Sequence, residues 1–175
     1  MPSGRTHDVI TYTLAPATFV GALAFWGRPV VALAATVAMI FAGLMFGPDL
    51  DLASKQYRRW GPLRFIWWPY MTVLSHRSRL SHGIMLSTVV RILYFLAVVA
   101  LLATLGLYLR QRFLYGVQTT WGVEFRQVGR GMGEFWRRTD KEYFWAAFAG
   151  LWLGAAAHTV ADLVVTIAKK LWQAV

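Results

Sequence analysis

Histidine and aspartate occur in closely spaced pairs in this sequence, and both residue types bind transition metals. His158 and Asp162 are four residues apart inside an apolar run, so a helix there places both side chains on one face. An ionisable pair in such a run usually faces the interior of a helical bundle. Asp49 and Asp51 follow Pro48, and in an extended segment their side chains point the same way. These spacings indicate a metal site, with a structural hydrogen-bonded pair as the alternative for His158 and Asp162.

The other three histidines each precede an apolar run. His7 lies before the first run, and His76 and His82 lie before the third, in LSHRSRLSHG. Six residues turn an α-helix by about 240°, so His76 and His82 do not share one straight helical face. We expect one of them in a loop and the other at the start of the following helix.

Composition places these residues in a membrane protein. The chain has 175 residues, of which 57% are hydrophobic, and its formal net charge is +10. Soluble domains are about 45–50% apolar. The long apolar runs therefore favour a membrane protein whose cationic side chains contact lipid headgroups over a protein whose cationic side chains bind nucleic acid. We therefore expect membrane lipids, and no nucleic acid, as partners. With no cysteine in the chain, disulfides and thiolate ligands are excluded.

The apolar runs predict an all-α, polytopic bundle of about four transmembrane helices in a single membrane domain, 1–175. The runs divide the chain into a helical hairpin at 9–46, an interfacial loop at 47–83, a span at 84–109, an interfacial loop at 110–142 and a span at 143–167. The first run, which contains Pro16, is either a span or a re-entrant helix. An amphipathic helix, interrupted at GRGMG, is predicted within 113–143. Cations are equally divided between the two sides, so orientation stays open.

This topology brings the ionisable groups to one membrane face, because the N-terminus, the first interfacial loop and the C-terminal end share a side. The expected metal ligands are His7, Asp49, Asp51, His76, His82, His158 and Asp162. Seven candidates exceed a four-coordinate site, which suggests more than one ion. Imidazole and carboxylate ligands suit zinc, manganese or iron as the divalent metal.

Three arginines near these groups have two interpretations each. Arg77 and Arg79 either contact lipid headgroups or clamp an anion beside the metal. Arg91, in the third run, either snorkels to the interface or reaches the acidic site.

The stretch PDLDLASKQYRRWGPLRFIWWPY, followed by LSHRSRLSHG and RILYF, resembles an uncharacterised bacterial family of metal-binding membrane proteins that is common in photosynthetic prokaryotes. The resemblance covers residues 3–95 and, more loosely, HTVAD at 158–162. That family is similar to inner-membrane proteins predicted to be metal-dependent hydrolases, which share P-D-x-D, H-R-x-x-x-S-H and a late H-x-x-x-D. More distantly it is similar to zinc-dependent phospholipase C. The resemblance implies a zinc hydrolase, and the absence of a glutamate near these motifs implies one or two ions rather than three.

The first functional hypothesis is a metal-dependent hydrolase of a phosphoester or lipid-like substrate. Asp49 or Asp51 would take the proton of a water, and Arg77 and Arg79 would hold the anion. The alternative is a non-catalytic subunit or assembly factor of a larger membrane complex, with a photosynthetic complex as one candidate host. An ion transporter ranks last, because only His158 and Asp162 lie within a span. The expected location is an integral position in either the plasma membrane or the thylakoid membrane.

Overall fold

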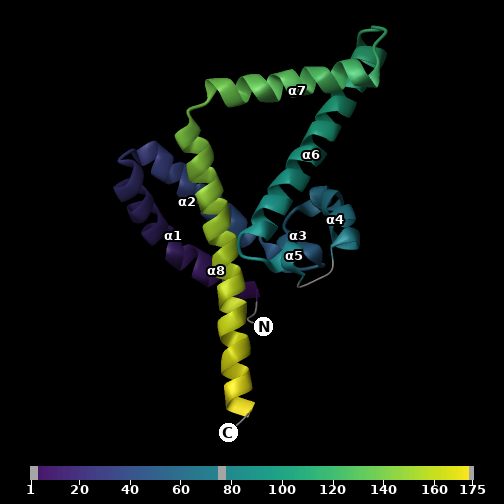
Figure 1. Ribbon diagram of the computed structural model, residues 1–175. Coiled ribbons are helices and arrows are strands. Elements are labelled where there is room, and N and C mark those ends of the chain that lie inside the picture. The colour runs from purple at the N-terminus through teal and green to yellow at the C-terminus, as the bar shows by residue number, and fades with distance from the viewer. Residues whose placement is uncertain (1–3, 75–77, 174–175) are drawn as a thin grey trace. The chain divides into compact units, whose positions relative to one another are not determined.

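The computed structural model describes residues 4–74 and 78–173, apart from the side chains of Arg79 and His82. Every regular element in these residues is helical, which confirms the all-α prediction (Figure 1). The chain forms two compact units. The first contains the residues up to Arg91 together with those from Lys141 onward, and the second is Ile92–Asp140.

The first unit is built on a helical hairpin that packs against the last helix. Helix α1 (Gly4–Trp26) and helix α2 (Pro29–Leu44) are joined by a tight turn in which Gly27 has a φ of 65°. Glycine adopts this left-handed conformation at no steric cost, and Pro29 is suited to the first turn of α2. Helix α8 (Lys141–Gln173) lies against this hairpin (Figure 1).

Two glycines let α8 approach α2 closely. A Cβ on Gly150 would overlap the carbonyl of Ala35, and one on Gly154 would overlap the carbonyl of Met39. Ala35 and Met39 are almost completely buried at this contact. The contact fixes the position of α8 along α2, and His158 lies one turn beyond Gly154.

Three helices of the described chain are long and apolar enough to cross a membrane. They are α1, α8, and α6 (Leu86–Leu109) with the turn η3 (Arg110–Leu114) that continues it. Helix α2 has only 16 residues, or about 24 Å, which is less than the roughly 30 Å of a bilayer core. The second apolar run is therefore a shorter helix than the sequence indicated, because Pro29 and the Gly47-Pro48 pair bound it.

The predicted loop 47–83 contains short helices: η1 (Pro48–Asp51), α3 (Lys55–Arg58), η2 (Gly61–Trp67), α4 (Trp68–Val73) and α5 (Arg79–His82). Aromatic side chains hold this segment against the end of α2. Trp67 is fully buried and its ring contacts those of Phe46, Trp60 and Tyr70 at centroid distances of 5.5, 5.3 and 5.7 Å. Trp60 also donates a hydrogen bond to the carbonyl of Met45. This packing positions η1 and α3 over the N-terminal end of α1.

The second unit contains most of α6, η3 and helix α7 (Trp121–Arg138). The prediction that GRGMG interrupts this helix is wrong, since α7 runs unbroken through residues 129–133. Glycine weakens a helix without terminating it. The turn before α7 contains Gly116 at a φ of 63°, and the Thr119 hydroxyl donates a hydrogen bond to Glu124.

Candidate metal centre

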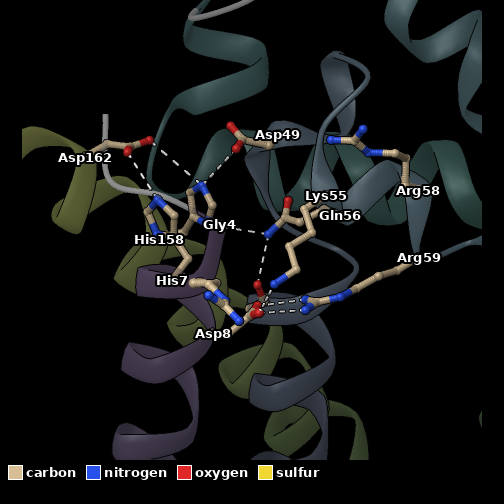
Figure 2. A pocket seen from close by; sticks show the side chains of 12 residues that line it. Gly4, His7, Asp8, Asp49, Lys55, Gln56, Arg58, Arg59, His158 and Asp162 are labelled. Carbon is tan, nitrogen blue, oxygen red and sulfur yellow. Dashed lines mark hydrogen bonds and ion pairs between the residues drawn. The ribbon is translucent and has the colours of Figure 1, made fainter.

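The centre is formed where the first helix of the chain meets the last. His7 from α1 and His158 from α8 stack their imidazole rings, with centroids 3.6 Å apart and planes 12° apart (Figure 2). Both residues are buried, at 7% and 5% exposure. Helix α8 presents His158 here because the Gly150 and Gly154 contacts hold it against α2.

Asp162 completes the group, one turn after His158 on the same face of α8. Its carboxylate oxygens lie 3.3 Å from Nε2 of His7 and 3.8 Å from Nε2 of His158. One nitrogen from each histidine and one oxygen of Asp162 all lie within 4.8 Å of one another. Two imidazoles and a carboxylate are a common protein ligand set for a catalytic zinc ion, which leaves a position for water.

The buried polar atoms of this group fit a bound cation. Apart from the ion pairs that these residues form with one another and with Asp49, Nδ1 of His7, Nε2 of His158 and both carboxylate oxygens of Asp162 have no hydrogen-bond partner in the part of the chain that the structure describes. Buried polar atoms are almost always satisfied, because each unsatisfied one costs free energy. A metal ion would satisfy several of these atoms at once.

Gln56 of α3 fixes the orientation of the His158 ring. Its amide nitrogen donates a hydrogen bond to the carbonyl of Gly43 (2.9 Å) and lies 3.5 Å from Nδ1 of His158. Nε2 of His158 therefore faces Asp49 and Asp162. Contacts of this kind hold the ring of a metal-binding histidine in position.

The two aspartates that follow α2 diverge. The 3₁₀ turn η1 replaces the extended segment predicted from the sequence, because Pro48 lies at the first position of a helical turn after Gly47. Asp49 Oδ2 lies 3.2 Å from Nε2 of His158. Asp51 is buried and acts electrostatically on Tyr70 and Arg91. Thus Asp49 joins the histidines and Asp51 is not among the residues that line their pocket.

Asp8 points away from the cluster although it follows His7 directly. Its carboxylate accepts two hydrogen bonds from the Arg59 guanidinium, at 2.8 and 2.7 Å, and pairs with Lys55 (Figure 2). Arg59 also donates to the carbonyl of Leu44. The ion pairs tie α1 to α3 and hold His7 at the cluster.

A cavity of about 490 Å³ opens beside the metal group. Polar and charged residues from α1, η1, α3 and α8 line it, among them Arg5 and Arg58, which are both exposed. The metal group therefore lies in the wall of a cavity that also contains cations, an arrangement suited to an anionic ligand.

Arg91 does not snorkel, and that interpretation is wrong. Its side chain is fully buried, and the guanidinium donates to the carbonyl of Ser81 (3.3 Å) and to the hydroxyls of Ser87 and Thr88 (3.5 Å each). It lies near Tyr70, whose pKa burial raises to about 12. These buried contacts hold the start of α6 against the short helices.

The structure describes the remaining predicted site residues only in part or not at all. His76 and Arg77 lie outside the described residues, and Arg79 and His82 belong to α5 without described side chains. Their expected roles stay predictions, as does the role of Asp51 as a ligand.

Sequence reasoning missed the contributions of α3. Gln56, Arg58 and Arg59 follow one another closely in SKQYRRW, which reads as an interfacial charged segment. The closeness of this segment to PDLD in the sequence could have indicated its role. The short helix α3 follows η1 almost directly, so its side chains can lie beside those of η1 at the site.

The chain belongs to the family described as uncharacterized metal-binding protein (DUF2227), whose model matches residues 2–172. Neither a curated protein nor a solved structure matches the chain.

Proposed function

We propose that this member of a metal-binding family is a membrane-embedded, metal-dependent hydrolase of an anionic phosphoester or lipid-like substrate. The observation that carries the proposal is the His7, His158 and Asp162 group in the wall of a cation-containing cavity. Zinc is the proposed ion, since imidazole and carboxylate ligands suit it.

His7, His158 and Asp162 would hold a divalent ion, which would supply an acidified water and a Lewis acid for a phosphoryl oxygen. Asp49 is the proposed general base, because its carboxylate lines the cavity beside His158 and its side chain is 21% exposed. A carboxylate in this position accepts the proton of an attacking water. Gln56 keeps the His158 ring in the orientation that this arrangement requires.

Arg58 and Arg5 are the proposed binding groups for the substrate anion. Of the four cations that line the cavity, Lys55 and Arg59 are paired with Asp8, whereas Arg58 and Arg5 are exposed and carry their charge toward solvent. Guanidinium groups bind phosphate oxygens in a bidentate manner. Arg77 and Arg79 remain proposed as additional contacts.

An apolar groove supports a lipid-like substrate. It has a volume of about 570 Å³ and lies between α1 and α8, with Ala35 and Met39 of α2 also lining it. His7 of α1 and His158 of α8 stack against each other. Helices α1 and α8 lie close together near the N-terminus of the chain and diverge from there (Figure 1). A Cβ on Gly21, which lines the groove, would meet no atom within 4 Å. An acyl chain in this groove would place its headgroup near the cavity.

The test compares hydrolysis of a long-chain phospholipid with hydrolysis of its water-soluble headgroup phosphoester by zinc-loaded protein. Gly21→Leu fills the groove, and Gly106→Leu is a matched control at an equally open site on α6. We expect Gly21→Leu to lose activity on the phospholipid alone and Arg58→Gln to lose activity on both substrates. Absence of hydrolysis by the metal-loaded wild type would overturn the proposal.

The same preparation tests the alternative role as a subunit of a larger complex. A stoichiometric protein partner retained in mild detergent, together with inactive protein, would favour that alternative over hydrolysis.

A further inference from the structure

We infer that helix α7 lies in the membrane interface and binds anionic lipid headgroups along one face. This inference is independent of the proposed hydrolysis, since α7 belongs to the second unit and contributes no residue to the metal group. It depends on insertion of α6 and α8 into the bilayer.

One face of α7 is apolar and exposed. At 3.6 residues per turn, Val123 lies on the opposite side of the helix, and the other six large apolar side chains fall within an arc of about 100°. They are Trp121, Phe125, Val128, Met132, Phe135 and Trp136. Trp121, Phe125 and Met132 are 44%, 50% and 43% exposed. An arc of this width, rich in tryptophan and phenylalanine, is typical of helices that lie in the headgroup region.

The opposite face is cationic. Arg126, Arg130 and Arg137 are exposed and lie within about 40° of one another around the helix axis. The nearby acid Glu134 is 3.8 Å from a different arginine, Arg138. Three aligned guanidinium groups therefore follow the length of the helix, which is complementary to a row of anionic headgroups.

The one acid near the apolar face is shielded. Glu124 is 3% exposed and accepts a hydrogen bond from the Thr119 hydroxyl at 2.7 Å. Its charge is therefore held inside the unit, away from the exposed apolar side chains. This burial leaves the face suited to a lipid environment.

Chain connectivity confines α7 to the membrane surface. Residues 115–120 join it to η3, and only Thr139 and Asp140 separate it from α8. Both neighbours are candidate spans, so neither end of α7 can move far from the bilayer. Four of its 18 residues are glycine, a weak helix former, so a helix of this composition gains order from a surface that covers its apolar face.

The absence of cysteine from these 175 residues permits a direct test on the intact chain. A bimane fluorophore is attached at Met132→Cys on the apolar face, or at Gln127→Cys on the polar face as a matched control, in nanodiscs. We expect brominated lipid to quench the first label and iodide to quench the second. Iodide quenching of both labels would overturn the inference. Protection of the Met132→Cys label from both quenchers would also overturn it, because a protein surface would then cover the apolar face.

Lipid charge is tested with the same label in mixtures of phosphatidylglycerol and phosphatidylcholine. We expect brominated phosphatidylglycerol to quench the Met132→Cys label more strongly than brominated phosphatidylcholine. The difference should vanish in Arg126→Gln/Arg130→Gln/Arg137→Gln and at high salt. Equal quenching by the two lipids in the protein with its arginines intact would refute anionic recognition.

Discussion

The imidazole rings of His7 and His158 stack 3.6 Å apart, although the residues belong to the first and the last helix of the chain. Two imidazolium cations at this distance would repel each other strongly in a buried site. A histidine nitrogen binds metal in the neutral form of the ring. The Asp162 carboxylate supplies one negative charge, which would offset half the charge of a divalent ion.

Gln56→Leu should weaken metal binding without removing a ligand. The substitution removes the amide that lies beside Nδ1 of His158 and bonds to Gly43, so the ring loses its orientation. Loss of such an outer contact typically costs about 10–100-fold in metal affinity. Competition with a fluorescent chelator in detergent measures the change. Gln127→Leu, on an exposed face of α7, is the control, and equal affinities for the two variants would contradict the role of Gln56.

Gly154→Ala should destabilise the protein, because its methyl group would overlap the Met39 carbonyl. Overpacking of this kind costs about 1–3 kcal/mol. Thermal unfolding in one detergent provides the comparison with Gly106→Ala, where the methyl group meets no atom within 4 Å. The control should be neutral or more stable by up to about 1 kcal/mol, since alanine favours helix over glycine. A stable Gly154→Ala would show that the helices do not approach this closely.

Asp8→Asn should lower stability without removing a metal ligand. The change removes the charge that accepts two hydrogen bonds from Arg59 and pairs with Lys55 in a partly buried position. We expect a loss of about 1–2 kcal/mol. Glu142→Gln breaks the more exposed pair with Arg28 and should cost less than about 1 kcal/mol. Similar losses in the two variants, measured by thermal unfolding, would argue against the tie between α1 and α3.

Tyr70→Phe should change how stability depends on alkaline pH. Burial raises the pKa of the Tyr70 phenol to about 12, above its ordinary value of about 10. The unfolded chain therefore loses this proton first, and stability declines as pH rises from about 10 to 12, by up to about 1.4 kcal/mol per pH unit. Below pH 10 the phenol contributes no slope. Denaturant unfolding at pH 9 and pH 11 should show a smaller decline in Tyr70→Phe than in the wild type, and identical declines would contradict the burial of the phenol.

The sequence predicted the elements and the chemical character of the site because those depend on local patterns. The spacing of His158 and Asp162 placed both on one face of a helix, and α8 presents them together. The apolar runs predicted long helices, since a run of this length is stable in few other forms. Topology alone predicted that the two ends of the chain meet, and the contact of His7 with Asp162 agrees with it.

The parts that the sequence did not predict depend on tertiary packing. Which of His7 and Asp8 faces the metal group is decided by Arg59, whose guanidinium captures Asp8. The divergence of Asp49 and Asp51 results from a 3₁₀ turn where alternation predicted an extended segment. The burial of Arg91 depends on its contact with Ser81, in the segment 47–83 that the sequence predicted only as an interfacial loop.

Metal content tests the central claim most directly. Elemental mass spectrometry on detergent-purified wild type should find at least one equivalent of a divalent metal, with zinc as the expected ion. His7→Ala/His158→Ala should lose it, while Glu142→Gln, which lies far along α8 from the site, should retain it. A wild type that binds no divalent metal, or a double variant that keeps its full content, would contradict the assignment of His7 and His158 as ligands.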